Sequence, residues 1–268
     1  MPTRAFRIAY DGRPYSGFQR QPDVPTVEDA VFDSLRALGV LDAGDVPPNY
    51  AAAGRTDAGV SALAQTVAFG APDWLTPAAL NAELPATVRA WAGADVPADF
   101  HATHDAVRRT YRYHLYAPGA DDGRVRRALD RLTGEHDFHN LTTDDEGTVR
   151  RLDAACVRDD EFLVLVLAAG GFARHMVRRI ATLVRAVGRG ESDLDRIDRV
   201  LGPGPLDGPE GVGTAAAMPL VLADVTYPGV EFAVDPDAAE SARDVFETRR
   251  VAALTAARVV GDLCRDLE

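Results

Sequence analysis

A short loop near residue 57 places a carboxylate beside an arginine, between two glycines. The stretch reads Gly54-Arg55-Thr56-Asp57-Ala58-Gly59-Val60. A neighbouring arginine favours the ionised form of a carboxyl group, which suits a nucleophile or a base. The alternative is a plain turn, in which the Asp57 side chain accepts hydrogen bonds from nearby backbone N–H groups. Residue types alone favour the turn over a reactive site.

A second candidate is an arginine stripe on a helix predicted from Phe172 to about Val187. Arg174, Arg178 and Arg185 have the spacing i, i+4 and i+11, so they share one face of that helix. Apolar residues cover most of the remaining surface of the helix. Arginines that border such a helix must meet solvent, carboxylates or phosphates. A solvated edge is the simpler interpretation for Arg185.

A predicted strand after residue 104 mixes aromatic and basic side chains. Tyr111 and Tyr113 alternate with Arg109 and Arg112 along it. This mixture suits stacking on nucleic-acid bases together with contacts to phosphates. Paired tyrosines on a strand also occur in protein cores, and we expect Tyr113 to be a core residue.

Histidine and cysteine positions give little sign of a bound metal. Two histidine pairs have a three-residue spacing, His136 with His139 and His101 with His104. An isolated pair of this kind is a weak predictor of a ligand set. The only cysteines, Cys156 and Cys264, lack the paired spacings of a zinc site. We therefore expect neither a metal nor a disulfide.

Hydrophobic periodicity predicts strands and helices in a similar order in both halves of the chain. Strands are expected near 6–10, 49–53, 65–69 and 88–96, and again near 107–115, 148–157, 162–168 and 220–227. Helices are expected near 26–38 and from 76 onward, and again near 123–132, 172–187 and 194–201. Asp57 then lies in a loop between strands. The order predicts two α+β lobes that share a sheet.

A break in the pattern around residues 97–104 predicts a boundary between lobes. We expect an N-terminal lobe over residues 1–100, which carries the Asp57 loop, and a C-terminal lobe over residues 101–228. The remainder, residues 229–268, is acidic and helix-prone from about Pro236. We expect it to form an appended helical tail.

The charge balance is unusual for a protein that binds nucleic acid. The 268 residues include 41 acidic and 29 basic side chains, a formal net charge of −12, and every basic residue is an arginine. Phosphate binding normally shows as a basic footprint. Molar salt shortens the Debye length to about 3 Å and screens the repulsion within an acidic surface. The acid excess therefore predicts a salt-rich environment, whereas a GC-rich genome is an equally good cause of the missing lysines.

Targeting and membrane signals are absent from the sequence. The chain has no apolar run of the length that spans a bilayer, and its N-terminus lacks a charged segment followed by an apolar stretch. We expect a cytoplasmic protein without a membrane partner.

Four segments, in this order, resemble the TruA family of tRNA pseudouridine synthases. They are Tyr10-Asp11-Gly12 with Gly17-Phe18-Gln19-Arg20-Gln21, then Ala53 to Val60, then Phe100-His101-Ala102 with Arg109 to Tyr113, and finally Phe172 to Arg178. The resemblance implies the pseudouridine synthase fold, in which two ferredoxin-like lobes share a mostly antiparallel sheet with flanking helices. It also implies cofactor-free isomerisation of uridine on the 3′ side of the tRNA anticodon stem-loop. The enzyme would be a homodimer in which one tRNA touches both subunits.

The resemblance also implies roles for single residues. Asp57 matches the family's catalytic aspartate, which attacks a flipped-out uridine so that the glycosidic bond breaks and a carbon–carbon bond forms at C5. Arg55 matches an arginine that helps to displace the target base, and Arg178 matches the arginine that pairs with the aspartate. Tyr111 matches the tyrosine that stacks on the target uracil. Further substrate contacts are expected at Arg20, Gln21, Arg109, Arg174 and a pocket leucine, either Leu220 or Leu222.

The sequence departs from the family pattern at three places. Ser61 stands where bacterial members usually carry histidine, and Phe18 where many carry tryptophan. Met218-Pro219 replaces a glycine-containing approach to the last strand. These departures bear on the exact target nucleotides and on the choice of leucine rather than on the reaction.

Two other functional classes remain as alternatives. A tRNA-binding protein without catalysis would tolerate loss of Asp57 or Arg178, yet both are present. A hydrolase that forms a phospho-aspartate would require a second aspartate two residues away and a magnesium cluster. Arg55 and Gly59 occupy those two positions.

Overall fold

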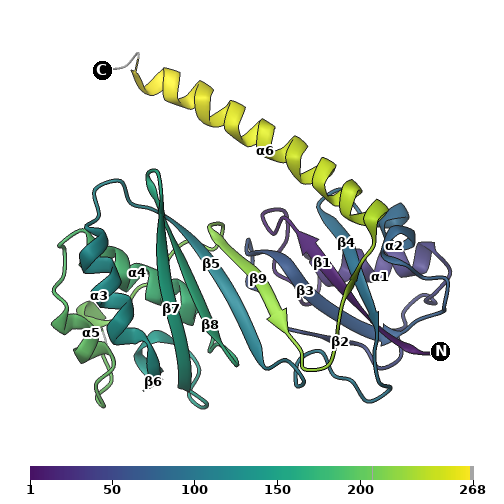
Figure 1. The fold of residues 1–268 in the computed structure, drawn as a ribbon, viewed down its shortest axis with the longest axis horizontal. Helices are drawn as coiled ribbons and strands as arrows, with labels where there is room; N and C mark the ends of the chain where they lie inside the picture. Colours follow the sequence, from purple (N-terminus) through teal and green to yellow (C-terminus); the bar gives the residue numbers. More distant parts are fainter. Residues whose placement is uncertain (207, 266–268) are drawn as a thin grey trace.

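A computed structural model describes residues 1–206 and 208–265 (Figure 1). The first half of the chain forms β1 (Thr3–Tyr10), α1 (Val27–Ala37), β2 (Ala51–Ala52), β3 (Ser61–Gly70), α2 (Pro77–Glu83) and β4 (Val88–Asp95). The second half forms β5 (Arg108–Tyr116), α3 (Asp122–Leu132), β6 (Gly134–Asp137), the 3-10 helix η1 (His139–Leu141), β7 (Val149–Asp159), β8 (Phe162–Ala169), α4 (Met176–Gly188), α5 (Asp195–Val200), the 3-10 helix η2 (Gly208–Glu210) and β9 (Leu220–Thr226). The chain continues through β10 (Ala233–Val234) into α6 (Pro236–Arg265).

The strands form one sheet that runs through the whole molecule. Its order is β10-β4-β1-β3-β9-β5-β8-β7-β6, and β2 pairs with β3 to the side of this path. The strand pairs are antiparallel except for β3 and β9, which meet in parallel register through Ser61 with Val221 and Ala62 with Leu222. The predicted α+β fold with a large, mostly antiparallel sheet and flanking helices is confirmed.

Capping residues explain where the first helices begin. Thr26 precedes α1 and its side chain accepts a hydrogen bond from the backbone N–H of Asp29. Thr76 caps α2 in the same way, with Pro77 in the first turn. Asp121 caps α3 through the N–H of Arg124. Each of these starts lies within one or two residues of its predicted position.

Two hydrophobic cores lie on the helix-covered face of the sheet. In the first, α1 and α2 pack against β1, β3 and β4, and this core also takes in Leu222, Val225 and Tyr227 from the late strand β9 and its end. In the second, α3, α4 and α5 pack against β5, β7 and β8. The strand β9 therefore joins the two halves, since its side chains belong to both cores.

Arg7 fastens β9 to the first half. Its guanidinium is buried, and burial lowers its pKa. It donates hydrogen bonds to the carbonyl oxygens of Ala64 (3.1 Å) and Val225 (2.5 Å), and it lies 3.4 Å from the carboxylate of Asp224. One side chain of β1 thus binds β3 and β9 across the parallel seam.

The structure corrects the predicted start of the arginine-bearing helix. The prediction was Phe172, but α4 begins at Met176 because the preceding residue, His175, has a left-handed backbone with φ of 62°. Arg174 therefore lies before the helix and does not share a helical face with Arg178 and Arg185. The short edge strands β6 and β10 were not predicted, since neither shows a clear alternation of apolar residues.

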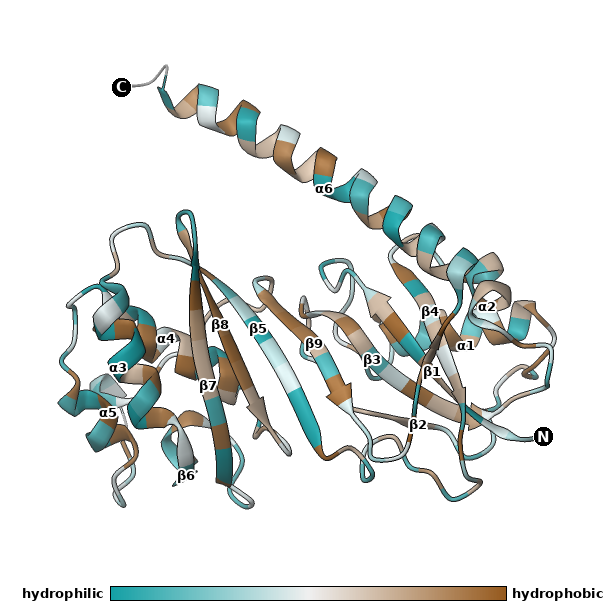
Figure 2. Cartoon of the chain, in the orientation of Figure 1, coloured by the Kyte–Doolittle hydropathy of each residue, from teal (hydrophilic) through white to brown (hydrophobic). Residues whose placement is uncertain are grey.

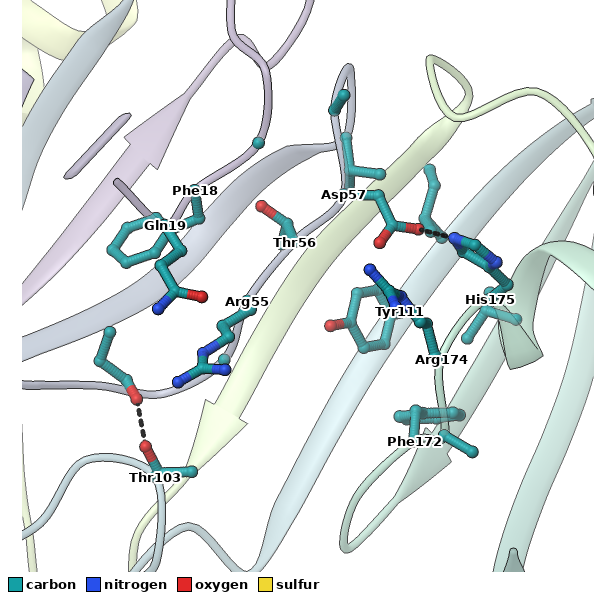
Figure 3. A pocket seen from close by; sticks show the side chains of 18 of the residues that line it. Phe18, Gln19, Arg55, Thr56, Asp57, Thr103, Tyr111, Phe172, Arg174 and His175 are labelled. Carbon is teal, nitrogen blue, oxygen red and sulfur yellow. Dashed lines mark hydrogen bonds and ion pairs between the residues drawn. The ribbon is translucent and has the colours of Figure 1, made fainter. Parts of the chain in front are cut away.

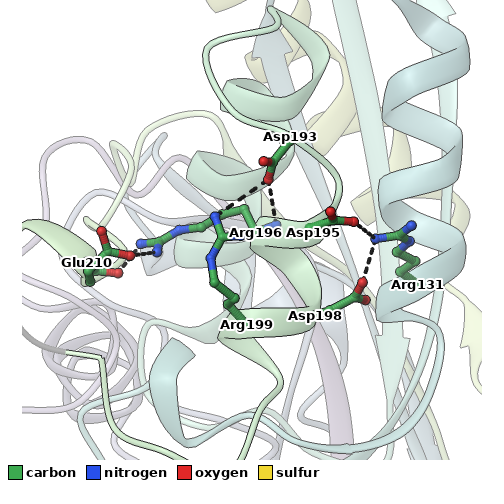
Figure 4. A network of polar contacts seen from close by, with 7 residues as sticks. All are labelled: Arg131, Asp193, Asp195, Arg196, Asp198, Arg199 and Glu210. Carbon is green, nitrogen blue, oxygen red and sulfur yellow. Dashed lines mark hydrogen bonds and ion pairs between the residues drawn. The ribbon is translucent and has the colours of Figure 1, made fainter.

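Surface arginines around α5 pair with carboxylates (Figure 4). Arg131 of α3 lies 2.6 Å from Asp198 and 3.4 Å from Asp195. Arg196 pairs with Glu210, and Arg199 lies 3.5 Å from Asp193. The arginines in this region are therefore engaged within the protein, which leaves little positive charge there for a phosphate.

The helix α6 has a packed half and a free half. Ala238, Ala239 and Ala242 are buried, and Arg249 lies 3.0 Å from Asp11 at the end of β1. From Val251 to Arg265 the side chains are exposed, and this part of the helix stands away from the sheet (Figure 1). Within the described part of the chain, no helix combines the length and apolarity that crossing a bilayer requires.

Candidate active site

The Asp57 loop is built against the segment that follows β1. The backbone N–H of Phe18 donates to the carbonyl oxygen of Thr56 at 3.0 Å, and the Tyr10 hydroxyl lies 2.7 Å from Thr56 Oγ1. Gly17 has a φ of 111°, and a Cβ there would lie 3.0 Å from the Thr56 oxygen. The chain before Asp57 is therefore fixed by contacts that a larger residue at position 17 would disturb.

The chain after Asp57 is held just as closely. A Cβ on Gly12 would lie 2.0 Å from the carbonyl oxygen of Val60, so only glycine allows this approach of the two backbones. The Gly12 N–H donates to Ser61 Oγ at 3.0 Å. Gly59 turns the loop with a φ of 80°, and its N–H donates to the Tyr15 oxygen at 3.3 Å. Gly12 and Gly59 thus help to hold the Asp57 carboxylate in place.

Asp57 is paired with two side chains from the start of α4. Arg178 Nη1 lies 2.9 Å from Asp57 Oδ2, and Arg178 Nε donates to the Ala215 oxygen at 2.7 Å. His175 Nε2 lies 3.5 Å from the same Oδ2 (Figure 3). Within the described residues, Asp57 Oδ1 accepts no hydrogen bond. The geometry neutralises one carboxylate oxygen and leaves the other open to the cleft.

His175 is a site residue that the sequence analysis missed. Its αL backbone is rare for a non-glycine residue and costs of order 1 kcal/mol, which the surrounding structure must offset. The turn directs the imidazole back toward Asp57, as Figure 3 shows. A signal was present, because His175 lies between Arg174 and Arg178 in one of the segments that carry the family resemblance.

Tyr111 forms a wall of the site from the middle of β5. Its ring packs edge-on against Phe172, with 5.1 Å between ring centroids. Burial raises the pKa of Tyr111 to about 12, and Arg109 and Asp57 act on it in opposite directions. The hydroxyl therefore stays protonated at neutral pH, where it can donate a hydrogen bond but cannot act as a base.

These residues line a cleft of about 1380 Å³ between the two halves. One side comes from residues 16–19, Gln21 and most of residues 50–60, and the other from residues 172–178, with Tyr111 and Leu220 between them. A volume of this size exceeds the ~300–1,000 Å³ of a small-molecule pocket and suits part of a polymer. Arg55 and Arg174 are exposed within it, so positive charge flanks the carboxylate.

The other predicted site residues divide into two groups. Arg55, Arg174, Gln21 and Leu220 line the cleft together with Asp57, Tyr111 and Arg178. Arg20, Arg109 and Leu222 do not line it. Of the two candidate leucines, Leu220 is therefore the one at the cleft, and Leu222 is fully buried in the first core.

Arg20 and Arg109 are engaged within the protein. Arg20 Nε lies 2.8 Å from Asp29 Oδ1, and its guanidinium stacks over Phe32. Arg109 donates to the carbonyl oxygens of Ala53 (2.8 Å), Thr103 (2.7 Å) and Gly170 (2.6 Å). Arg109 thus anchors the chain that enters the Asp57 motif, and its predicted contact with substrate stays a prediction.

The histidines set aside as metal ligands include two that border the cleft. His101 and His104 line it, and their rings lie 4.2 Å apart. Over residues 1–206 and 208–265, no group of three or more His, Cys, Asp or Glu side chains could hold a metal ion. Both cysteines are free thiols.

Comparison with known proteins identifies the family. A family described as tRNA pseudouridine synthase matches residues 128–228. The chain is 58% identical over 266 residues to tRNA pseudouridine synthase A of Haloarcula marismortui, covering 96% of this chain and 97% of that one. It is 60% identical over 262 residues to the protein of that name from Natronomonas pharaonis, covering 97% and 98%.

The chain belongs to the tRNA pseudouridine synthase A family.

Membership in the tRNA pseudouridine synthase A family gives the protein its class: it is an isomerase that acts on uridine in tRNA. The likeness reaches beyond halophilic archaea, since the family member of Archaeoglobus fulgidus is 38% identical over 91% of each chain. The halophilic origin of the relatives from Haloarcula marismortui and Natronomonas pharaonis agrees with the acid excess of the sequence. Among solved structures, a chain of the archaeal box H/ACA Nop10–Cbf5 complex aligns over 69% of this chain and 44% of its own, with 13% identity and a TM-score of 0.38.

Proposed function

We propose that this tRNA pseudouridine synthase modifies uridines at positions 38 to 40, on the 3′ side of the anticodon stem-loop, with Asp57 as its nucleophile. The observation that carries the choice of Asp57 is its half-paired carboxylate. Arg178 holds Oδ2 at 2.9 Å while Oδ1 faces the cleft between Arg55, Arg174 and Tyr111. A carboxylate held by an arginine beside a stacking surface is what attack on an extruded nucleotide requires.

The proposed reaction conserves every atom of the nucleotide. Asp57 forms a transient bond to the nucleotide, the bond between uracil N1 and ribose C1′ breaks, and the uracil turns. C5 then bonds to C1′, and the bond to Asp57 breaks so that the free carboxylate returns. The proton on C5 leaves and N1 gains one, so no oxidant, reductant or cofactor takes part. Arg178 stabilises the carboxylate whenever Asp57 leaves the substrate as an anion.

Tyr111 and the exposed arginines would handle the RNA. The Tyr111 ring, fixed edge-on by Phe172, offers a face on which the flipped uracil can stack. Arg55 is exposed in the cleft and, among the described residues, has no ion-pair or hydrogen-bond partner. It can therefore occupy the space that the base leaves, and Arg174 and Gln21 can contact the backbone.

A homodimer acting in a salt-rich cytoplasm completes the proposal. The face of the sheet opposite the cleft is uncovered in the second half, where Tyr116, Val157 and Phe162 are exposed. A second subunit there would cover apolar surface and leave the cleft accessible to tRNA. Molar salt would screen the repulsion between two subunits that each carry a net charge of −12.

Tritium release tests the reaction and the nucleophile together. We expect tRNA labelled at uracil C5 to release tritium with the wild type in molar potassium chloride and not with Asp57→Asn. Binding of tRNA by the variant should stay within a few fold of the wild type. Failure of the folded wild type to release tritium from any tRNA would favour the alternative, a tRNA-binding protein without catalysis.

The target positions need a separate measurement. Chemical mapping of pseudouridine in treated tRNA should place the product on the 3′ side of the anticodon stem-loop, and substrates with these uridines replaced by cytidine should be inert. Product elsewhere in tRNA would contradict the proposed position while leaving the isomerase assignment intact.

Unfolding of the protein in dilute buffer would support the proposed adaptation to high salt, and full stability in dilute buffer would count against it.

A further inference from the structure

Two histidines at the edge of the cleft take no part in the proposed reaction. His101 and His104 lie in the turn between β4 and β5, and both line the cleft that holds Asp57. The centroids of their rings lie 4.2 Å apart, with an angle of 38° between the ring planes. His104 is exposed, and its ring nitrogens have no hydrogen-bond partner within the described residues. The turn therefore presents an unused imidazole face beside a candidate site for RNA.

The turn that carries the two rings is closed by its own hydrogen bonds. The backbone N–H groups of Thr103 and His104 donate to His101 Nδ1 at 3.2 and 3.4 Å. The N–H of His101 donates to Asp105 Oδ2 at 2.8 Å, so the Asp105 carboxylate is engaged within the turn. Because His101 Nδ1 is an acceptor, the hydrogen of the neutral ring lies on Nε2. That N–H lies on the edge of the ring away from the turn backbone, where it can donate to a ligand.

The turn is fastened to the chain that leads into the Asp57 loop. Thr103 Oγ1 donates to the carbonyl oxygen of Ala52 at 2.5 Å. Arg109 donates to the carbonyl oxygens of Thr103 (2.7 Å) and Ala53 (2.8 Å), so one guanidinium bridges the two segments. Ala53 and Asp57 are separated by no more than about 14 Å, since an extended chain spans at most ~3.6 Å per residue. In a stacked strand, about four nucleotides cover this distance at ~3.4 Å each.

The turn also leads directly into β5, the strand that carries Tyr111. In Figure 2, β5 is mostly teal and white, whereas the neighbouring β8 is largely brown. Polar residues in a central strand are informative, because most positions there are apolar. In β5, Arg109 fastens the turn and Tyr111 lines the cleft. The two histidines are thus fixed by the same elements that position Asp57 and Tyr111.

The chemistry of this turn fits a nucleotide of an RNA strand. Aromatic side chains, histidine included, stack on bases that have left a helix, and N–H groups bind phosphate and sugar oxygens. Neither contact depends on a long-range field, so both persist in the molar salt that the acidic composition predicts. The exposed Arg55 lines the same cleft, and Figure 3 shows it with Thr103 on the side of the site away from His175. Arg55 adds positive charge for the phosphates of a strand that runs past the turn.

A purely structural role accounts for one of the two histidines. His101 stabilises the turn through its Nδ1 atom. The imidazole of His104 contributes no hydrogen bond to the described part of the fold, and its exposure limits what burial can contribute. The fold therefore does not explain the histidine at position 104, whereas a stacked base does.

From these features we propose that the turn from His101 to His104 is a second nucleotide subsite of the cleft. A base close to the target uridine in the same RNA strand stacks on the free face of His104, and His101 Nε2–H donates to that nucleotide. The inference rests on the proposed binding of tRNA in the cleft and adds a defined contact to it. The subsite fixes the strand beside the extruded uridine, so the target reaches Asp57 with less freedom to move.

Substitution of His104 tests the stack. We expect His104→Ala to raise the dissociation constant for tRNA about 10-fold in molar potassium chloride, and His104→Phe, which keeps an aromatic face, to stay within about 3-fold of the wild type. His136→Ala is the control, because His136 is a half-buried histidine that does not line the cleft. All proteins carry Asp57→Asn so that filter binding measures affinity without turnover. Equal constants for His104→Ala and His136→Ala, or equal losses for the alanine and phenylalanine variants, would overturn the inference.

His101→Asn separates the turn from the ligand. The asparagine Oδ1 takes the place of Nδ1 and can accept from Thr103 and His104, whereas the Nε2–H donor is lost. Thermal unfolding should match the wild type, while the dissociation constant for tRNA rises about 5-fold. An unchanged affinity would confine His101 to the turn and contradict its part in the subsite.

Photo-crosslinking locates the nucleotide. Stem-loop RNAs carry a single 5-iodouridine at each position within about four nucleotides of the modified uridine, and each RNA is irradiated with Asp57→Asn protein. One position should link to the peptide that contains residues 101–104, and His104→Ala should remove that link. Links to other segments alone, or a link that persists in His104→Ala, would overturn the inference.

Failure of this inference can be told apart from failure of the proposed function. Affinity and crosslinking are measured without turnover, whereas tritium release reports the reaction. A protein that releases tritium and binds tRNA equally well with His104→Ala would keep its proposed reaction and lose this subsite. A protein that needs His104 for binding but releases no tritium would keep the subsite and lose the proposed reaction.

Discussion

Arg178 donates to Asp57 from a position 121 residues further along the chain, with Nη1 at 2.9 Å from Oδ2. The contact joins the first turn of α4 to the loop before β3, so it exists only when both halves of the sheet are in register. The N-terminus of α4 adds its own partial positive charge near the carboxylate. Five expected outcomes follow from this site and its supports.

Replacing Arg178 by glutamine should remove the positive charge beside Asp57 and the hydrogen bond from Arg178 Nε to the Ala215 oxygen. A charge-assisted hydrogen bond contributes ~1.5–3 kcal/mol, which corresponds to a loss of about 10- to 100-fold in rate. Single-turnover tritium release measures this, and filter binding should show tRNA affinity within a few fold of the wild type. Equal losses of tRNA affinity and of rate would mean that Arg178 contacts the RNA rather than supporting Asp57.

His175→Gly and His175→Ala separate backbone strain from side-chain chemistry. Glycine adopts the observed φ of 62° without cost, whereas alanine keeps the strain, so the glycine variant should be more stable by about 1 kcal/mol. Both variants lack the imidazole near Asp57 and should lose activity to a similar extent. Thermal unfolding and tritium release provide the two readouts. An active glycine variant would show that the ring has no part in the reaction.

Tyr111→Phe and Tyr111→Leu separate the hydroxyl from the aromatic face. Phenylalanine keeps the stack and the contact with Phe172, so tRNA affinity should hold while the rate falls. Leucine removes the aromatic face, and base stacking contributes ~1–3 kcal/mol, so affinity should fall as well. Titration of tRNA binding by fluorescence distinguishes the two. A fully active phenylalanine variant would exclude a role for the hydroxyl.

Gly12→Ala should damage the site from a distance. Its Cβ would lie 2.0 Å from the Val60 oxygen, so the loop that carries Asp57 must move. Overpacking of this kind costs ~1–3 kcal/mol, and the displaced carboxylate should reduce the rate more than the stability. Gly119→Ala is the control, since no heavy atom lies within 4 Å of the added Cβ. Similar activity in both variants would show that the loop adapts.

Alkaline pH should destabilise the fold through its buried tyrosines. Burial raises the pKa of Tyr111 and of Tyr227 to about 12, and it also raises the pKa of Tyr10. The unfolded chain loses these protons near pH 10, so this stability is complete below pH 10 and falls as pH rises toward 12. Urea unfolding from pH 9 to 11.5 measures the slope. Tyr111→Phe should make the fall of the unfolding free energy with pH shallower. An unchanged pH dependence would contradict the raised pKa of Tyr111.

The sequence predicted the elements that local chemistry determines. The caps at Thr26 and Thr76 place two helices correctly, and alternation places most long strands. The sequence could not show that the Arg109 guanidinium donates to three carbonyl oxygens, because those partners lie in distant loops. The helix start at Met176 was missed because an αL histidine has no signature in hydrophobic spacing. The lobe boundary near residue 100 stays a prediction, since the first core also contains Leu222 and Val225.

The parallel seam between β3 and β9 has a consequence for how the protein is made on the ribosome. Ser61 and Ala62 pair with Val221 and Leu222, and the guanidinium of Arg7 donates to the carbonyl oxygen of Val225. These partners are synthesised about 160 to 220 residues later. During synthesis, the first half must therefore remain incomplete until more than 220 residues have emerged from the exit tunnel. The loop that carries Asp57 borders that seam, so the active site is completed late in the folding of the enzyme.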